Sequence, residues 1–240
     1  MSITPITHVI FDLDGIIVDS VNSIVNIFVN YARNYGKTLD EDIRKGIPNL
    51  TNFSVYFNKF LDTIHGPAVD DGSVDRETIV KEMIDEIYES PQLSLIPGVD
   101  RLVQHLRRHR IPMAVATGNN SPNLAKIVRN LGDYFRRGVN FDHLVCGWDD
   151  PDVSRNKPAP DVYFVCAKRF QTQPQSLDNV LIVEDSLTGI TGALDTGMKT
   201  LLINDRKNCD FDAVANRITC IVDSFDDFRP ESVGLPPYDD

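Results

Sequence analysis

The stretch His8-Val9-Ile10-Phe11-Asp12-Leu13-Asp14-Gly15 decides how the rest of this sequence is interpreted. Val9 to Phe11 is a short apolar run with β-branched and aromatic residues, which predicts a buried strand. In open α/β sheets, ligands bind outside the carboxyl ends of the strands, so we expect Asp12 and Asp14 to face such a crevice. Leu13, between them, is expected to point back into the core. For this short pattern alone, an ordinary acidic turn is the alternative.

Two carboxylates this close to each other predict a bound cation. Like charges at short range raise each other's pKa unless a cation neutralises them. Mg²⁺ favours carboxylate, carbonyl and phosphate oxygens as ligands. We therefore expect Mg²⁺ as the cofactor at Asp12 and Asp14.

Composition and charge limit the classes of function. The chain has 240 residues, of which 42% are hydrophobic and 25% charged, as in soluble globular proteins. Its formal net charge of −11 offers no basic surface for nucleic acid or for an anionic membrane. No apolar run has the length of a membrane span, and no signal-peptide pattern opens the chain. We expect neither nucleic acid nor membrane as a partner.

The cysteines predict a reducing compartment. Cys146, Cys166, Cys209 and Cys220 form no C-x-x-C pair and have no histidine at zinc-like spacing. Such usage is typical of cytosolic proteins, so we expect a cytoplasmic location.

The pattern between residues 20 and 92 is helical. Ser20 is a candidate N-cap, Ile24, Ile27, Phe28, Tyr31 and Tyr35 recur at helical spacing, and Gly36 is expected to end that helix. A loop is predicted at about 64–73, and Met83 and Ile87 belong to the clearest later apolar face. No strand is expected in this region.

From residue 97 onward, helices and strands alternate. Helices are expected at 98–110, 122–131, 160–170 and 187–196, and strands at 112–117, 144–146, 180–183, 200–203 and 219–222. Alternation of this kind predicts right-handed crossovers and a doubly wound, Rossmann-like parallel sheet covered by helices on both faces. Because the first strand must join this sheet, we expect an α/β core of residues 1–19 and 93–240, with residues 20–92 inserted as a helical cap.

Polar residues that could take part in catalysis stand at four positions where the chain leaves this core. At three of these positions an apolar strand directly precedes the polar residues, so the sheet should gather them at one edge. Each has an ordinary alternative, since strand-end threonines often cap helices and a lysine before a proline usually lies in solvent. The residues are Asp12 with Asp14, Thr117, Lys157, and Glu184 with Asp185.

The order and spacing of these residues resemble the haloacid-dehalogenase-like (HAD) phosphatases over essentially the whole chain. The four motifs are Phe11-Asp12-Leu13-Asp14-Gly15, Ala116-Thr117-Gly118-Asn119, Lys157-Pro158-Ala159-Pro160-Asp161 and Val183-Glu184-Asp185-Ser186-Leu187-Thr188-Gly189-Ile190. The helical insert stands where this family carries a C1-type cap. Within the superfamily, the core is most similar to the β-phosphoglucomutase-like group. Cys166-Ala167-Lys168-Arg169-Phe170 and the segment 228–236 are similar to the pseudouridine-5′-phosphatase branch.

The resemblance and the residue chemistry imply the same mechanism. Asp12 would attack phosphorus to form an aspartyl-phosphate, and Asp14 would act as general acid and then general base. Thr117, Gly118, Asn119 and Lys157 would bind the transferring phosphoryl group. The Mg²⁺ ligands would be Asp12, the Asp14 backbone carbonyl and Asp185, with Glu184 either as a ligand or one shell further out.

Departures from the family pattern bear on the substrate. The stretch from Val21 to Ile24 differs from the residues that are usual in the family. Ile24 stands at the position of the mutase histidine, and its side chain cannot carry a proton. Asn49 belongs to a cap segment that lacks the usual basic substrate loop, and Asn156 replaces a glycine before the lysine. We therefore expect a phosphatase acting on a sugar, polyol or nucleoside monophosphate, such as pseudouridine 5′-phosphate.

Three other functions stay open at this level. A phosphomutase of the β-phosphoglucomutase type is disfavoured by Ile24. A receiver-type signalling domain orders its acids differently and has no large helical insert. A catalytically retired HAD scaffold that binds a partner is compatible with the altered cap, but every core acid is retained.

The remaining polar residues receive ordinary interpretations. His65, His105, His109 and His143 are expected to be surface or structural residues, and Tyr238-Asp239-Asp240 a mobile tail. For the assembly we expect a monomer, although the sequence leaves a dimer open.

Overall fold

The structure is a computed structural model, and it describes residues 4–47, 53–66, 75–89, 93–136, 138–204 and 211–239. Within these ranges a single six-stranded sheet has the order β3-β2-β1-β4-β5-β6, and all neighbouring strands are parallel. The chain builds outward in both directions from β1, which confirms the predicted doubly wound α/β sheet. The strands are β1 (His8–Phe11), β2 (Met113–Thr117), β3 (His143–Cys146), β4 (Val180–Glu184), β5 (Lys199–Ile203) and β6 (Cys220–Val222).

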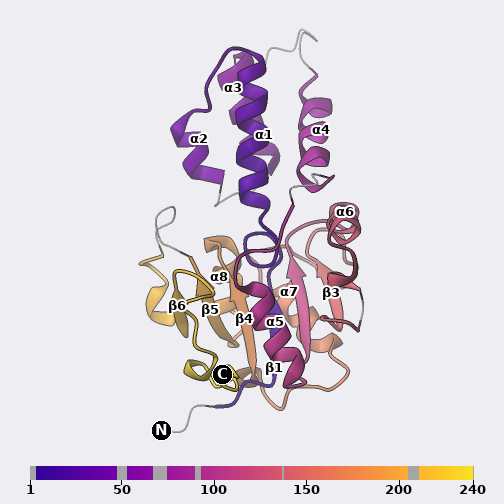
Figure 1. The fold of residues 1–240 in the computed structure, drawn as a ribbon, viewed down its shortest axis with the longest axis vertical. Coiled ribbons are helices and arrows are strands. Elements are labelled where there is room, and N and C mark those ends of the chain that lie inside the picture. The colour runs from indigo at the N-terminus through magenta and orange to yellow at the C-terminus, as the bar shows by residue number, and fades with distance from the viewer. Residues whose placement is uncertain are drawn as a thin grey trace.

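The helices divide into a group inserted directly after β1, beyond the ends of the strands, and a group that covers the sheet (Figure 1). Inserted are α1 (Ser20–Asn34), α2 (Glu41–Gly46), α3 (Phe53–His65) and α4 (Arg76–Glu89). The other helices are α5 (Val99–Arg108), α6 (Ser121–Leu131), α7 (Asp161–Arg169) and α8 (Leu187–Leu194).

Alternating side chains of β1 supply the cores on the two faces of the sheet. Val9 and Phe11 pack on one face with Leu102 and Leu106 of α5. Ile10 packs on the other face with residues of α7. This two-residue period on a strand buried on both sides is the reason why its apolar run is continuous.

An aromatic cluster joins the inserted helices. Phe28 of α1 stacks on Phe60 of α3 with ring centroids 4.2 Å apart, and meets Phe57 edge-on at 4.8 Å. These rings are buried and belong to the same apolar cluster as Phe11 of β1. Figure 1 shows α1–α4 beyond the upper ends of the strands, on the side where the chain leaves β1. No strand occurs between residues 20 and 89 in the part of the chain that the structure describes.

Two local predictions in α1 are wrong. Asp19, not Ser20, is the N-cap, because its carboxylate accepts a hydrogen bond from the Asn22 amide at 3.2 Å, while Ser20 is already helical. Tyr35 is 52% exposed because it is the C-cap residue, where the helical periodicity no longer applies. Gly36 follows at a φ of +66°, as expected of a residue that ends a helix.

Some predictions fall outside the described residues. They concern Asn49, Cys209 and most of the predicted loop at 64–73. Cys146, Cys166 and Cys220 are free thiols. In the described ranges, none of the helices has the length and apolar character needed to cross a membrane.

Candidate active site

The carboxyl ends of the central strands bring most of the predicted site residues together. Asp12 directly follows β1, Thr117 ends β2, and Glu184 ends β4. Because the strands are parallel and paired in register, these ends lie side by side at the edge of the sheet that faces α1–α4 (Figure 1). Leu13 is completely buried, as predicted, so the two acids on either side of it turn toward the same edge.

Lys157 connects two of these acids. Its Nζ atom lies 2.6 Å from Asp12 Oδ1 and 2.7 Å from Glu184 Oε1, and donates to the Ala116 carbonyl at 2.9 Å. An ammonium group has three donors, and all three are used here. Burial by itself would lower the pKa of Lys157, but Asp12 and Glu184 offset this and hold that pKa above its usual value.

Glu184 is completely buried, on the face of the sheet that α7 covers. Tyr163 of α7 donates its hydroxyl to Glu184 Oε1 at 2.6 Å, and Ser186 donates to Oε2 at 3.4 Å. Gly189, in the first turn of α8, leaves the space that the carboxylate occupies, since a Cβ atom there would overlap it. Sequence reasoning missed Tyr163, because helical periodicity does not say which residue of α7 reaches the end of β4.

The two carboxylate oxygens of Asp14 differ in their hydrogen bonds. Its Oδ2 accepts from Asn119 Nδ2 at 3.0 Å, whereas Oδ1 is buried and has no hydrogen-bond partner among the described residues. Burial raises the pKa of Asp14 above its usual value. A carboxyl group in such surroundings is suited to carry a proton and release it to an incoming oxygen.

Tyr88, near the end of α4, reaches this site from the inserted helices. Its side chain is buried, and its hydroxyl accepts from Asn119 Nδ2 at 2.7 Å, the same amide nitrogen that donates to Asp14. Asn119 is also fixed through its Oδ1, which accepts from Asn123 Nδ2 at 3.0 Å. Tyr88 was missed at the sequence level because it falls outside all four motifs.

Thr117, Gly118 and Asn156 form the part of the site between β2 and Lys157. The Thr117 hydroxyl accepts from the Asn119 backbone N–H at 3.1 Å and keeps its own O–H for donation. Asn156 donates to the Gly118 carbonyl at 2.9 Å and accepts from the Lys157 amide at 2.8 Å. The asparagine that departs from the family pattern therefore links the second and third motifs directly.

The carboxylates of Asp12, Glu184 and Asp185 form a cluster that fits a cation. Their ligand oxygens lie within 4.8 Å of one another. Burial and the neighbouring Glu184 raise the pKa of Asp12 to about 7, and burial and Asp12 raise that of Asp185 strongly. Asp185 lies against Gly15, whose φ of +83° and missing Cβ leave room for the carboxylate. One ammonium does not neutralise three carboxylates, so the donor set suits a hard divalent ion.

The chain matches known proteins over nearly its full length. The family described as haloacid dehalogenase-like hydrolase matches residues 9–203. A (DL)-glycerol-3-phosphatase 2 from Arabidopsis thaliana is 31% identical over 98% of this chain and 94% of its own. A probable pseudouridine-5′-phosphatase from Drosophila melanogaster is 28% identical over 98% of this chain and 96% of its own.

Solved structures with the same fold include a mutase and a hydrolase. β-Phosphoglucomutase from Clostridium difficile superposes with a TM-score of 0.65 at 17% identity, covering 95% of each chain. A HAD-hydrolase from Bacillus subtilis in a magnesium-bound form gives a TM-score of 0.69 at 19% identity, covering 93% of this chain and 96% of that one. At these identities the likeness concerns the fold.

Proposed function

Because this chain belongs to the haloacid dehalogenase-like hydrolase family, we propose that it is a phosphatase that hydrolyses small phosphomonoesters by way of a phosphorylated Asp12. The observation that carries this proposal is that Asp12 and Asp14 lie close together in the chain but have different hydrogen-bond surroundings. Asp12 is bound by Lys157 at 2.6 Å, while Asp14 keeps one buried oxygen without a partner among the described residues. A nucleophile and a proton donor need these two different environments.

In the first step, an Asp12 oxygen attacks the phosphorus atom and the bond from phosphorus to the ester oxygen breaks. The leaving alkoxide takes the proton from Asp14, whose raised pKa favours the protonated form before the reaction. Thr117, Gly118 and Asn119 border the place of the phosphoryl oxygens, and Thr117 has an O–H to donate. Lys157 offsets the charge that builds up beside Asp12.

In the second step, Asp14 removes a proton from a water molecule, which attacks the phosphorus and frees the Asp12 carboxylate. Inorganic phosphate leaves, and Asp14 is again protonated for the next cycle. The hydrogen bond from Asn119 to Asp14 Oδ2 holds the carboxyl group in one orientation through both steps. Each step is an in-line displacement of the kind that positioning and electrostatic stabilisation accelerate.

Mg²⁺ is the proposed cofactor, held by Asp12, Asp185 and the Asp14 backbone carbonyl. The raised pKa values of Asp12 and Asp185 support this set, because they mark a site that lacks positive charge. Glu184 Oε1 already accepts from Lys157 and Tyr163, which favours Glu184 as a residue that orients Lys157. When bound, the ion supplies positive charge to the phosphoryl oxygens in the transition state.

The substrate is proposed to be a polyol, sugar or nucleoside monophosphate. The glycerol-3-phosphatase and the pseudouridine-5′-phosphatase support this class, since they align with 98% of this chain. A mutase is disfavoured because Ile24 is 3% exposed and packs in the core, where it can neither bind nor carry a proton. A retired scaffold is disfavoured by the intact contacts between Lys157, Asp12 and Glu184.

Location and assembly complete the proposal. We retain the cytosol as the compartment, supported by the free thiols of Cys146, Cys166 and Cys220. A small phosphorylated metabolite is the proposed partner, with no role for nucleic acid or membranes, and the protein is proposed to act as a monomer. We also keep residues 20–92 as a cap domain on a core of residues 1–19 and 93–240.

A substrate panel tests this function. Phosphate release from glycerol 3-phosphate, hexose and hexitol phosphates, pseudouridine 5′-phosphate and nucleoside monophosphates is measured with Mg²⁺ and again with EDTA. We expect turnover of at least one ester with Mg²⁺ and a loss of at least about a hundredfold with EDTA, because the carboxylate cluster then lacks its cation. Folded protein that is inactive on the whole panel would contradict the proposal.

Tyr88→Phe tests how the inserted helix acts on Asp14. The Tyr88 hydroxyl lowers the pKa of Asp14, so its removal will raise that pKa and move the alkaline limb of the pH–rate profile upward. We expect the rate at the optimum to fall about tenfold, the effect of losing one or two hydrogen bonds. Tyr31→Phe is the matched control, since that hydroxyl bonds His65 within the inserted helices. An unchanged profile would show that Tyr88 has no influence on the acid.

A further inference from the structure

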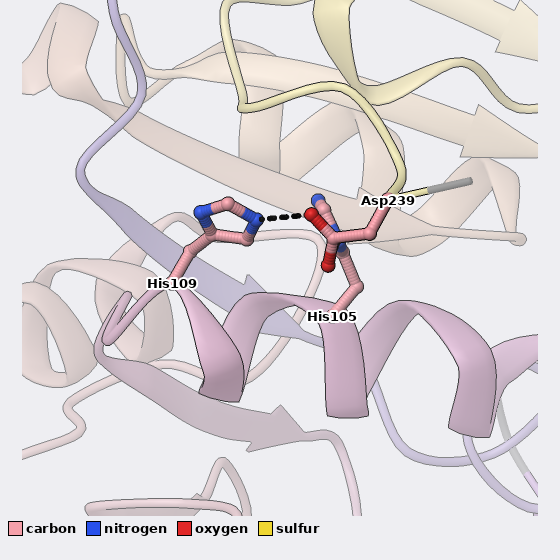
Figure 2. Close-up of side chains that lie close together, drawn as sticks. All are labelled: His105, His109 and Asp239. Atoms are coloured by element: carbon pink, nitrogen blue, oxygen red, sulfur yellow. Dashed lines mark ion pairs between the residues drawn. The ribbon is translucent and has the colours of Figure 1, made fainter.

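A second cluster of metal-ligating side chains lies on α5, away from the phosphatase site. His105 of α5 and His109, the C-cap residue four positions later, face Asp239 (Figure 2). One ligand atom of each residue lies within 4.8 Å of the others. Asp239 Oδ2 is 3.7 Å from His105 Nδ1, and Oδ1 is 3.4 Å from His109 Nε2. Figure 1 shows this end of the chain at the edge of the sheet opposite α1–α4.

His105 presents an unpartnered lone pair to this cluster. Its side chain is completely buried, and its Nε2 is 3.0 Å from the Pro236 carbonyl. A carbonyl only accepts, so Nε2 carries the proton and the neutral ring has its lone pair on Nδ1. Nδ1 is buried and has no hydrogen-bond partner among the described residues. At 3.7 Å from Asp239 Oδ2, Nδ1 is too far for a hydrogen bond.

The ring orientation of His105 is the one that metal-bound histidines adopt. Such histidines usually donate the second ring N–H to a backbone carbonyl or a carboxylate, which fixes the tautomer that leaves the other nitrogen free to bind. The spacings also suit a tetrahedral ion, because bonds of about 2.0 Å put neighbouring ligand atoms about 3.3 Å apart. Two imidazoles and one carboxylate form a ligand set typical of Zn²⁺.

We propose that His105 Nδ1, His109 Nε2 and the Asp239 carboxylate form a transition-metal site with a preference for Zn²⁺. The site would pin the segment that contains Pro236 and Asp239 to α5, since the ligands come from both. Its fourth position would be taken by water, because His109 and Asp239 are 33% and 54% exposed.

Neighbouring charges permit this ion. Arg108 Nε lies 3.1 Å from Asp239 Oδ2, and Arg108 is 57% exposed, so its guanidinium can turn into solvent when a cation enters. Arg101 lies over the ring of Tyr238, 4.0 Å from its centroid. Tyr238 also packs against His105 with ring centroids 4.9 Å apart. This segment is thus attached to α5, unlike the mobile tail expected from the sequence.

Metal titration of the full chain tests the proposal. Zn²⁺ binding is measured by calorimetry with excess Mg²⁺ present to occupy the phosphatase site, and Co²⁺ is titrated in parallel because its visible spectrum reports tetrahedral nitrogen and oxygen ligands. We expect one Zn²⁺ per chain at this site, with Co²⁺ bands of tetrahedral intensity. His109→Ala and Asp239→Asn should each weaken Zn²⁺ binding by at least about tenfold. Both residues are partly exposed, so these variants should fold.

Two control variants distinguish this site from the phosphatase cluster and from an ordinary surface ion pair. Asp195→Asn removes an exposed carboxylate that pairs with Arg217 at 3.1 Å, as Asp239 pairs with Arg108, and should leave Zn²⁺ binding unchanged. Asp185→Asn disrupts the phosphatase cluster and should also leave it unchanged. Zn²⁺ binding that is lost in Asp185→Asn but kept in His109→Ala would overturn the proposal, as would the absence of Zn²⁺ binding by the unmodified chain.

Discussion

Replacing Asp12 by asparagine will lower the rate of phosphate release by at least about a thousandfold, with Mg²⁺ present and on the best ester of the panel. The amide has nearly the same shape as the carboxylate, but its oxygen carries no charge and cannot form the aspartyl-phosphate. Lys157 and the neighbouring backbone remain, so the protein should bind phosphate and keep its fold. The measurement is steady-state phosphate release, together with acid-quenched labelling of the protein by a substrate that carries radioactive phosphate.

The labelling experiment separates the nucleophile from other roles of Asp12. The unmodified protein should retain label in a peptide that contains Asp12, and Asp12→Asn should retain none. Asp133→Asn is the control, because its side chain is 79% exposed and pairs with Arg136 at the surface. Labelling that persists in Asp12→Asn would move the nucleophile to another residue, and activity within tenfold of the unmodified protein would contradict the mechanism.

Replacing Lys157 by methionine will lower the free energy of unfolding by about 3–5 kcal/mol at pH 8 in EDTA, because it leaves buried carboxylates without their cation. The Lys157 side chain is 8% exposed and bonds both Asp12 and Glu184, so solvent cannot replace it. Urea unfolding measures the effect. Lys168→Met, at the exposed end of α7, is the control and should change the free energy of unfolding by less than about 0.5 kcal/mol.

The loss caused by Lys157→Met should depend on pH. Burial raises the pKa of Asp12 in the folded protein to about 7 although Lys157 lowers it, so in Lys157→Met that pKa rises further and a proton can replace the missing cation. Stability tied to a raised carboxyl pKa is present at low pH and is lost as the pH rises through the folded value. The difference between Lys157→Met and the unmodified protein should therefore be smaller at pH 5 than at pH 8. Equal differences at both pH values would show that Lys157 contributes through packing alone.

The sheet and the strand-end residues were predictable because they depend on local patterns. Continuous apolar runs identified the strands around Val9, Val115 and Ile182, and the structure has all three in the centre of the sheet. The resemblance to haloacid-dehalogenase-like proteins is confirmed by the family match, and the fold is shared with β-phosphoglucomutase. The gathering of Asp12, Thr117 and Glu184 follows from parallel strands, whose carboxyl ends all meet at one edge, whereas Lys157 reaches the site from the loop before α7.

Other contacts were not predictable, because they depend on the directions of side chains from distant elements. The N-cap of α1 moved by one residue, to Asp19, since Asp and Ser are both good caps and only the backbone geometry distinguishes them. His105 and His109 had the spacing of one helical face. The third member of their cluster, Asp239, is 130 residues or more away in the chain, where no periodicity connects them.

The sequence by itself determined the α/β architecture and the kinds of side chain at the carboxyl ends of the central strands. The spacing of apolar residues and the acids that follow β1 and β4 are local properties of the sequence. Only the tertiary structure decided how those groups are held. It brought Tyr88 from α4 onto Asn119 and Asp14, Tyr163 from α7 under Glu184, and three acceptors around the Lys157 ammonium. The physical reason is that hydrogen bonds and charge pairs form between side chains that packing brings within about 3 Å, and packing depends on the whole chain at once.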